Sequence, residues 1–88
     1  MSNRLEKIRL RLVTFNPTAF ELTDDSHKHA GHAGSASGGG HYVLRIASAQ
    51  FIGKNTIARH RMVYLALGDM MKQDIHALTI QALTPNEI

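Results

Sequence analysis

The sequence predicts a single α+β domain whose elements follow the order helix, strand, strand, helix, strand. Apolar residues recur at helical spacing near the N-terminus and again in the second half of the chain. Three other segments alternate between apolar and polar residues, as half-buried strands do. The chain has 88 residues, so we expect one domain, residues 1–88, with a small core.

The first helix is predicted from residues close to the N-terminus. Leu5, Ile8 and Leu12 recur at helical spacing and define one apolar face. Ser2 can cap the N-terminus of this helix with its hydroxyl group. Pro17 ends the helix, because the residue before a proline avoids the helical region of backbone conformation.

Three alternating segments are predicted to be strands, at residues 18–24, 41–48 and 76–83. The residues expected to face the core are Phe20, Leu22, Tyr42, Leu44, Ile46, Leu78, Ile80 and Ala82. His76 begins the third strand. If the strand is regular, its side chain lies on the same face as Leu78 and Ile80, but at the first residue of a strand we expect the ring at a rim and not buried.

The segment 25–40 is predicted to be a flexible loop, with residues 28–40 as the most mobile part of the chain. It is rich in glycine and serine, which offer little to bury. His27, His29 and His32 lie in it at spacings that suit zinc, copper, nickel or iron. The alternative interpretation is a solvated loop with no fixed ligand, because ordering such a backbone is costly.

A second helix is predicted over residues 56–71, after the helix-breaking Gly53. One sector of its helical wheel contains Ile57, His60, Val63, Tyr64, Leu67, Met70 and Met71. We expect His60 to be a core residue, because it lies within this apolar sector. Lys54, Arg61 and Lys72 form a basic strip at the edge of the sector.

The C-terminus carries a capping-box pattern. Thr84 can cap a helical turn, Pro85 suits its first position, and Glu87 completes the box. We therefore expect at most one helical turn after the third strand.

Composition excludes several classes of function. The chain has no cysteine, which rules out a disulfide framework and a thiolate metal site made by this chain alone. It shows no pairing of a nucleophile with a base, so an enzyme is not expected. It has neither an apolar run long enough to cross a membrane nor a secretory signal, and we expect a cytoplasmic protein. The net charge of +3 favours a polyanionic partner only weakly.

The ordered motifs of the chain resemble those of the BolA family. They are the segment from Asp24 to Gly34, Gly40-His41-Tyr42, Phe51-x-Gly53-Lys54, Arg59-His60-Arg61-x-Val63-Tyr64, Ile75-His76-Ala77-Leu78 and Thr84-Pro85-x-Glu87. The resemblance implies a fold similar to the class II KH domain, αββαβ, with a three-stranded mixed sheet and helices on one face. KH domains hold RNA with a GxxG loop, and this chain has only Gly53 before its second helix, so RNA gripping is not implied.

The resemblance further implies a partner and a cofactor. Members of the family pair with monothiol glutaredoxins and share a bridged [2Fe-2S] cluster, for iron-sulfur trafficking or iron sensing. The glutaredoxin supplies cysteine and glutathione thiolates, and the BolA-like protein supplies histidines. The matching ligands are His76 and His29, with His32 and His27 as alternates for the loop position. No cofactor is expected in the isolated chain, which we predict to be a monomer or a weak homodimer.

A second family role is a stress-responsive, DNA-binding transcriptional regulator that affects cell morphology. The basic strip of Lys54, Arg61 and Lys72 would then contact the phosphates of duplex DNA. A third interpretation is a small scaffold whose basic edge is only solvated. The sequence favours the glutaredoxin role, because that role accounts for both the histidines and the absence of cysteine.

Overall fold

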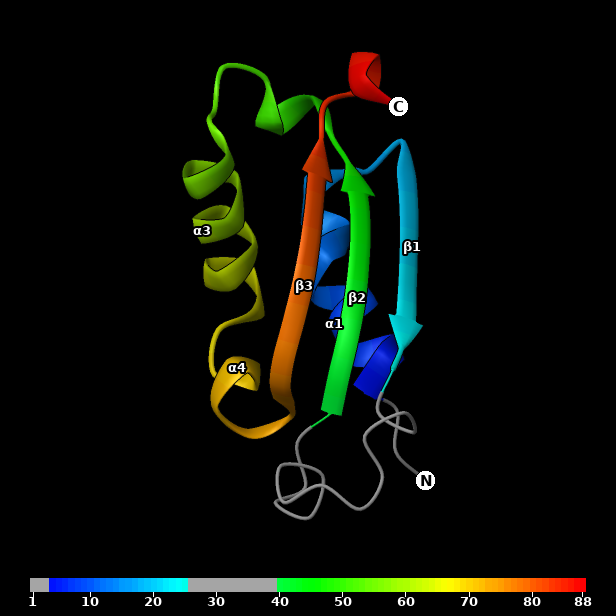
Figure 1. Cartoon of the computed structure of the whole chain (residues 1–88), viewed down its shortest axis with the longest axis vertical. Coiled ribbons are helices and arrows are strands. Elements are labelled where there is room, and N and C mark those ends of the chain that lie inside the picture. The colour runs from blue at the N-terminus through cyan, green and yellow to red at the C-terminus, as the bar shows by residue number, and fades with distance from the viewer. Residues whose placement is uncertain (1–3, 26–39) are drawn as a thin grey trace.

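The computed structural model describes residues 4–25 and 40–88, and its elements are shown in Figure 1. The helices and strands are α1 (Arg4–Leu12), β1 (Ala19–Asp24), β2 (Gly40–Ala47), α3 (Thr56–Leu67), α4 (Met70–Gln73) and β3 (Ile75–Leu83). Three short 3₁₀ turns accompany them: η1 (Val13–Phe15), η3 (Ala49–Phe51) and η4 (Pro85–Glu87). The predicted order is confirmed, and β2 begins at Gly40, the last residue of the expected loop.

The strands form a three-stranded mixed sheet in the order β1-β2-β3. β1 runs antiparallel to β2, and β2 runs parallel to β3. Figure 1 shows α1 behind the sheet and α3 beside β3, while no described helix covers the face of the sheet that is turned to the viewer. The predicted α+β class is therefore confirmed, and the described helices leave one face of the sheet open, here called the open face.

The core lies between the sheet and the helices, and the alternation predicted most of it. Its fully buried members are Ile8, Leu12, Leu44, Ile46, Phe51, Val63 and Leu67. Phe20, Leu22, Leu78, Ile80 and Ala82 pack against it from the outer strands. Leu5 was expected in this core but is 41% exposed. It lies in the first turn of α1, before the helix reaches the centre of the sheet.

The predicted helix over residues 56–71 is in fact two helices. α3 ends at Gly68, whose φ of 59° is a left-handed conformation that a glycine adopts without steric cost. Arg11 Nη1 donates to the carbonyl oxygen of Leu67 at 2.9 Å and so caps this helix end from α1. The expectation of one continuous apolar sector was wrong, and Ile57 is 68% exposed. Apolar residues lie on more than one side of α3, so periodicity alone could not select the buried side.

A buried serine at the end of β2 joins this strand to η1, near the N-terminus. Ser48 Oγ donates to the carbonyl oxygen of Phe15 at 2.7 Å and accepts from the Gln50 amide at 3.1 Å. The rings of Phe15 and Phe51 pack nearby with centroids 5.2 Å apart. Because its hydroxyl is satisfied in both directions, Ser48 can be buried without the cost of an unpaired polar group.

The C-terminal turn is fastened to α3 by Arg59. Both hydrogen bonds of the predicted capping box between Thr84 and Glu87 are present. Arg59 Nη1 donates to Glu87 Oε1 at 2.8 Å and to the carbonyl oxygen of Ala82 at 3.0 Å. Its Nε donates to the carbonyl oxygen of Lys54 at 2.8 Å. One guanidinium therefore links the start of α3 with the end of β3.

This link predicts a pH dependence of stability. The hydrogen bond from Arg59 holds the pKa of Glu87 below its ordinary value. A folded-state pKa below the unfolded one stabilises the fold above the unfolded pKa of about 4.3, and this contribution is lost as the pH falls through the folded pKa. Wild type should therefore be more stable than Glu87→Gln at pH 7, and the gap should close toward pH 3. The effect is small because the carboxylate is exposed.

Urea unfolding of both proteins across this pH range measures the gap. A difference between wild type and Glu87→Gln that does not change with pH would contradict this account of the contact with Arg59.

Candidate metal-ligand site at the start of the third strand

A β-bulge sets the direction of the His76 side chain. Gly40 pairs with Ile75, but the next residue of β2, His41, pairs with Ala77. His76 is therefore the extra residue of β3, and a bulge re-aims the side chains around it. Ile75 is buried and His76 is exposed. The bulge interrupts the alternation between Ile75 and Ala77, so the regular pattern that would place His76 on the face of Leu78 does not hold. The exposure of His76 agrees with the expected position at the rim of the sheet.

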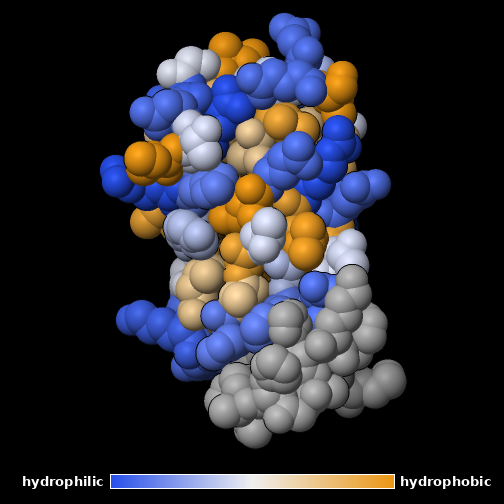
Figure 2. Space-filling view, in the orientation of Figure 1, coloured by the Kyte–Doolittle hydropathy of each residue, from blue (hydrophilic) through white to orange (hydrophobic). Residues whose placement is uncertain are grey.

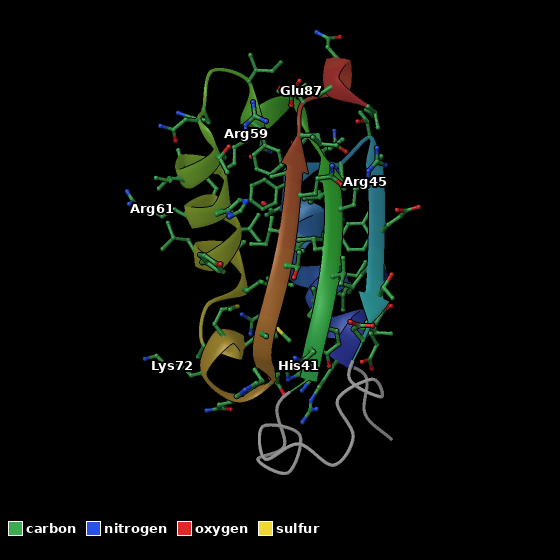
Figure 3. The ribbon with its side chains drawn as sticks, in the orientation of Figure 1. His41, Arg45, Arg59, Arg61, Lys72 and Glu87 are labelled. Carbon is green, nitrogen blue, oxygen red and sulfur yellow. The ribbon has the colours of Figure 1, made fainter. Side chains whose placement is uncertain are left out.

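The bulge places His76 against His41. The two ring centroids are 5.0 Å apart, and the ring planes are inclined by 39°. His41 is half-buried and its Nε2 atom is shielded from solvent, whereas the His76 side chain is exposed. Figure 3 marks His41 at the start of β2, beside the start of β3. Of the two imidazoles, that of His76 is therefore the more accessible to an incoming partner.

Backbone hydrogen bonds hold both strand ends that form this site. The amide of Asp25 donates to the carbonyl oxygen of His41 at 2.7 Å, beyond the last residue of β1. The amide of Gly40 donates to the carbonyl oxygen of Asp74 at 3.1 Å, and the amide of Asp74 donates to that of Met70 at 2.9 Å. β1, β2 and α4 thus fix the backbone on both sides of the histidine pair.

Tyr42 lies on the core side of this end of the sheet. A Cβ atom built on Gly40 would come within 2.5 Å of the Tyr42 hydroxyl oxygen, so the phenol ring occupies the space that a side chain at residue 40 would need. Burial raises the pKa of Tyr42 above its ordinary value. Arg4 Nε and Asp74 Oδ1 form an ion pair at 3.5 Å. The first helix is thereby joined to the residue that precedes β3.

The other predicted ligands, His27, His29 and His32, lie outside the described residues, as does nearly all of the predicted mobile loop. Among the described residues, no group of three or more histidine, aspartate or glutamate side chains is placed to hold a metal ion. His60, expected in the core, is half-buried on α3.

The three basic residues of the predicted strip are exposed. Figure 3 shows Arg61 and Lys72 pointing away from the sheet on the same side of the molecule. Arg61 lies on α3, Lys72 on α4 and Lys54 in the turn before α3. The sequence predicted a strip at the edge of one helical sector, and in the structure its three residues lie on three different segments.

The open face of the sheet adjoins the histidine pair. The strand register places His41, Val43 and Arg45 of β2 on this face, opposite Ala77, Thr79 and Gln81 of β3. Val43 is 39% exposed, and Figure 2 shows apolar residues gathered in the middle of the face with hydrophilic residues around them. An accessible apolar area beside an accessible imidazole suits a surface that docks another molecule.

His41 appears in the motif Gly40-His41-Tyr42 but was not predicted as a site residue. One signal in the sequence could have drawn attention to it. The core positions Tyr42, Leu44 and Ile46 imply that His41 faces away from the core. Its contact with His76 could not be predicted, because it depends on the parallel pairing of β2 with β3 and on the bulge.

The family model described as BolA-like protein matches residues 12–87. The chain belongs to the BolA family. This family is not one of enzymes, which agrees with the absence of a catalytic constellation predicted from the sequence. No helix of the described residues 4–25 and 40–88 is long and apolar enough to cross a membrane.

Several curated proteins are similar to this BolA-family chain. It is 43% identical to SufE-like protein 1, chloroplastic/mitochondrial, of Arabidopsis thaliana, over all of this chain but 25% of that protein. It is 35% identical to Protein BOLA1, chloroplastic, of the same plant, over 57% of that protein. It is 34% identical to the DNA-binding transcriptional regulator BolA of Escherichia coli, over 93% of this chain and 72% of that protein. The chain thus spans only part of each relative.

Solved structures confirm the fold. The BolA domain of SufE1 from Arabidopsis thaliana has a TM-score of 0.85 at 40% identity and covers 100% of this chain and 99% of its own. BolA1 from Mus musculus has a TM-score of 0.80 at 34% identity, over 99% of this chain and 69% of its own. The α+β arrangement with a three-stranded mixed sheet is therefore that of BolA structures.

Proposed function

We propose that this chain is the BolA-type partner of a monothiol glutaredoxin, and that it provides histidine ligands to a [2Fe-2S] cluster bridged between the two proteins. The cluster is cargo or signal in this scheme, for iron-sulfur trafficking or iron sensing. The carrying observation is the bulge in β3, which turns the imidazole of His76 out of the core and leaves it exposed.

The donor chemistry of the site fits the cluster. Imidazole nitrogen is a good ligand for iron, and in Rieske-type centres two histidines replace two cysteines on one of the irons. A BolA-family chain without cysteine can therefore contribute nitrogen donors, while the glutaredoxin and glutathione contribute thiolates. When bound, the cluster would supply the electron-accepting and transferable iron-sulfur group. This chain's residues would bind and orient it.

His76 is proposed as the fixed ligand. Its backbone lies between two anchored segments, α4 and the pairing of β2 with β3, so little backbone ordering entropy is lost when the residue coordinates. His29 is proposed as the second ligand, with His32 and His27 as alternates. All three lie in the segment that joins β1 to Gly40, and Gly40 pairs directly with Ile75, next to His76.

The test is a titration of the chain with a cluster-loaded monothiol glutaredoxin, followed by visible absorption and circular dichroism. A mixed-ligand cluster should give a spectrum that differs from the all-thiolate cluster of the glutaredoxin. An unchanged spectrum at saturating chain concentration would overturn the proposal. We place this role in the cytoplasm as part of the proposal, whereas two relatives carry chloroplastic or mitochondrial names.

A second candidate function is duplex DNA binding. It is favoured by the name of the Escherichia coli relative and by the exposure of Lys54, Arg61 and Lys72. Their ammonium and guanidinium groups would neutralise phosphates, so affinity would be modest and sensitive to salt.

This candidate yields a quantitative prediction. Each substitution of Lys54, Arg61 or Lys72 by alanine should flatten the negative slope of log affinity against log salt by about one unit. The three effects should add. Fluorescence anisotropy with a labelled duplex at several salt concentrations measures the slope. Arg9, which is paired with Glu6 on α1, offers a control: Arg9→Ala should leave the slope unchanged. Unaltered binding by the triple variant would exclude the strip as a DNA surface.

A further inference from the structure

The bulge that exposes His76 also leaves its side chain with little to hold it. His76 pairs with no residue of β2, and β3 lies at the edge of the described sheet. In a regular pair, cross-strand neighbours restrict the side-chain rotamers of a strand residue. An exposed imidazole without such a neighbour would sample several rotamers, and coordination would have to select one of them.

The His41 ring is placed where that neighbour is missing. Its centroid is 5.0 Å from that of His76, within the range of packed aromatic pairs, and the planes are tilted by 39°. His41 is itself well held, because it is half-buried and its carbonyl oxygen accepts the Asp25 amide at 2.7 Å. A fixed ring on β2 therefore packs against the exposed ring on β3.

Two roles for His41 can be compared, as a further ligand or as a support for the first one. The Nε2 atom of His41 is shielded from solvent, so a cluster presented from outside does not meet that nitrogen. The His76 side chain, by contrast, is exposed. The geometry therefore favours His41 as a support for the His76 ring over His41 as a second ligand.

We infer that His41 is a positioning residue, whose ring packs against the imidazole of His76 and restricts it to the orientation in which it coordinates a cluster. This inference rests on the proposed function and adds to it a residue that acts through His76 and not on the iron. The flat shape of the ring carries the effect, so another flat ring should replace it.

The experiment compares His41→Ala, which removes the ring, with His41→Phe, which keeps a flat ring. Val43→Ala is the matched control, because Val43 lies on the same strand and the same open face but pairs with Thr79. In the free protein, NMR relaxation and chemical shifts of the His76 ring should show greater rotamer averaging in His41→Ala. In His41→Phe and Val43→Ala they should stay close to wild type.

In the complex with a cluster-loaded glutaredoxin, transfer of iron to a chelator gives the second measurement. His41→Ala should release the cluster about threefold to tenfold faster, the factor that one aromatic pair contributes. His41→Phe should recover most of the wild-type rate. Pulsed electron paramagnetic resonance of the reduced cluster should show a broader spread of nitrogen couplings in His41→Ala, with a directly bound nitrogen still present.

The outcomes separate this inference from the proposed function. If His41→Ala leaves the His76 ring and the release rate unchanged while His76→Ala abolishes the mixed-ligand spectrum, only the positioning role is overturned. If His41→Phe is as defective as His41→Ala and one nitrogen coupling disappears, His41 is a ligand and the inference is wrong. If His76→Ala has no effect on the spectrum, the proposed function fails. The NMR comparison in the free protein then still shows whether the His41 ring restricts the His76 ring.

Discussion

Replacing His76 with alanine should abolish the spectral change that occurs when the chain meets a cluster-loaded monothiol glutaredoxin. His76 is the histidine of the described residues that the bulge turns out of the core, and its backbone is fixed by pairing with β2 on one side and by α4 on the other. Without its nitrogen the iron would keep thiolate or solvent ligands. Visible circular dichroism at saturating concentration measures the change, and the expected loss is essentially complete.

The control for this experiment is Lys7→Ala, an exposed residue of α1, which lies behind the sheet and away from its open face. It should leave the spectrum intact. Binding of the cluster-free glutaredoxin, measured by calorimetry, should survive His76→Ala, because the docking surface is larger than one imidazole. A wild-type spectrum from His76→Ala would show that the ligand lies elsewhere in the chain or that the chain binds no iron.

The loop ligand should respond differently. His29→Ala should weaken cluster binding and speed its loss to a chelator without abolishing the mixed-ligand spectrum, since His27 and His32 are close in sequence and can take its place. Combining the three substitutions should have the larger effect. If His29→Ala alone abolished the mixed-ligand spectrum as completely as the triple variant, His27 and His32 could not be replacing His29 as the ligand.

The second large effect concerns stability. Phe51→Ala should destabilise the fold by about 3–5 kcal/mol, because it removes a fully buried ring and leaves a cavity against Phe15. Domains of this size have a total stability of roughly 5 kcal/mol or somewhat more. We therefore expect Phe51→Ala to be largely unfolded at 37 °C. Urea unfolding monitored by far-ultraviolet circular dichroism measures the loss.

The neighbouring residue provides the control for burial. Ile52 is adjacent in sequence but 59% exposed, so Ile52→Ala should change the free energy of unfolding by less than about 0.5 kcal/mol. The milder Phe51→Leu should stay folded and keep the mixed-ligand spectrum, since the ring lies beyond the C-terminal end of β2 and the histidine pair lies at the start of that strand. Similar losses from Phe51→Ala and Ile52→Ala would contradict the assigned core.

Most of the fold could be predicted from the sequence because local chemistry determined it. The alternation in residues 41–48 was strong enough to identify the buried side of β2, and its central position in the sheet buried that side completely at Leu44 and Ile46. The capping box at Thr84 and Glu87 was also predicted correctly, because both of its hydrogen bonds are made within one turn.

The second helix marks the limit of such reasoning. Its apolar residues lie on more than one side, so the sequence could not select between Val63, which is buried, and Ile57, which is exposed. The choice was made by α1 and the sheet, against which only one side of α3 can pack. The hydrogen bond that Arg11 donates to Leu67 at the end of α3 likewise joins residues 56 positions apart, so local sequence could not predict it.

The candidate site divides in the same way. The sequence by itself determined which residues carry nitrogen donors, that no cysteine is present, and that a strand begins close to His76. Only the tertiary structure decided that His76 points outward and that His41 lies against it. The physical reason is that a bulge is defined by how two strands pair, and not by the sequence of one strand alone. The parallel strands β2 and β3 are joined through α3 and α4, so the register that places one extra residue at His76 is set when they pair.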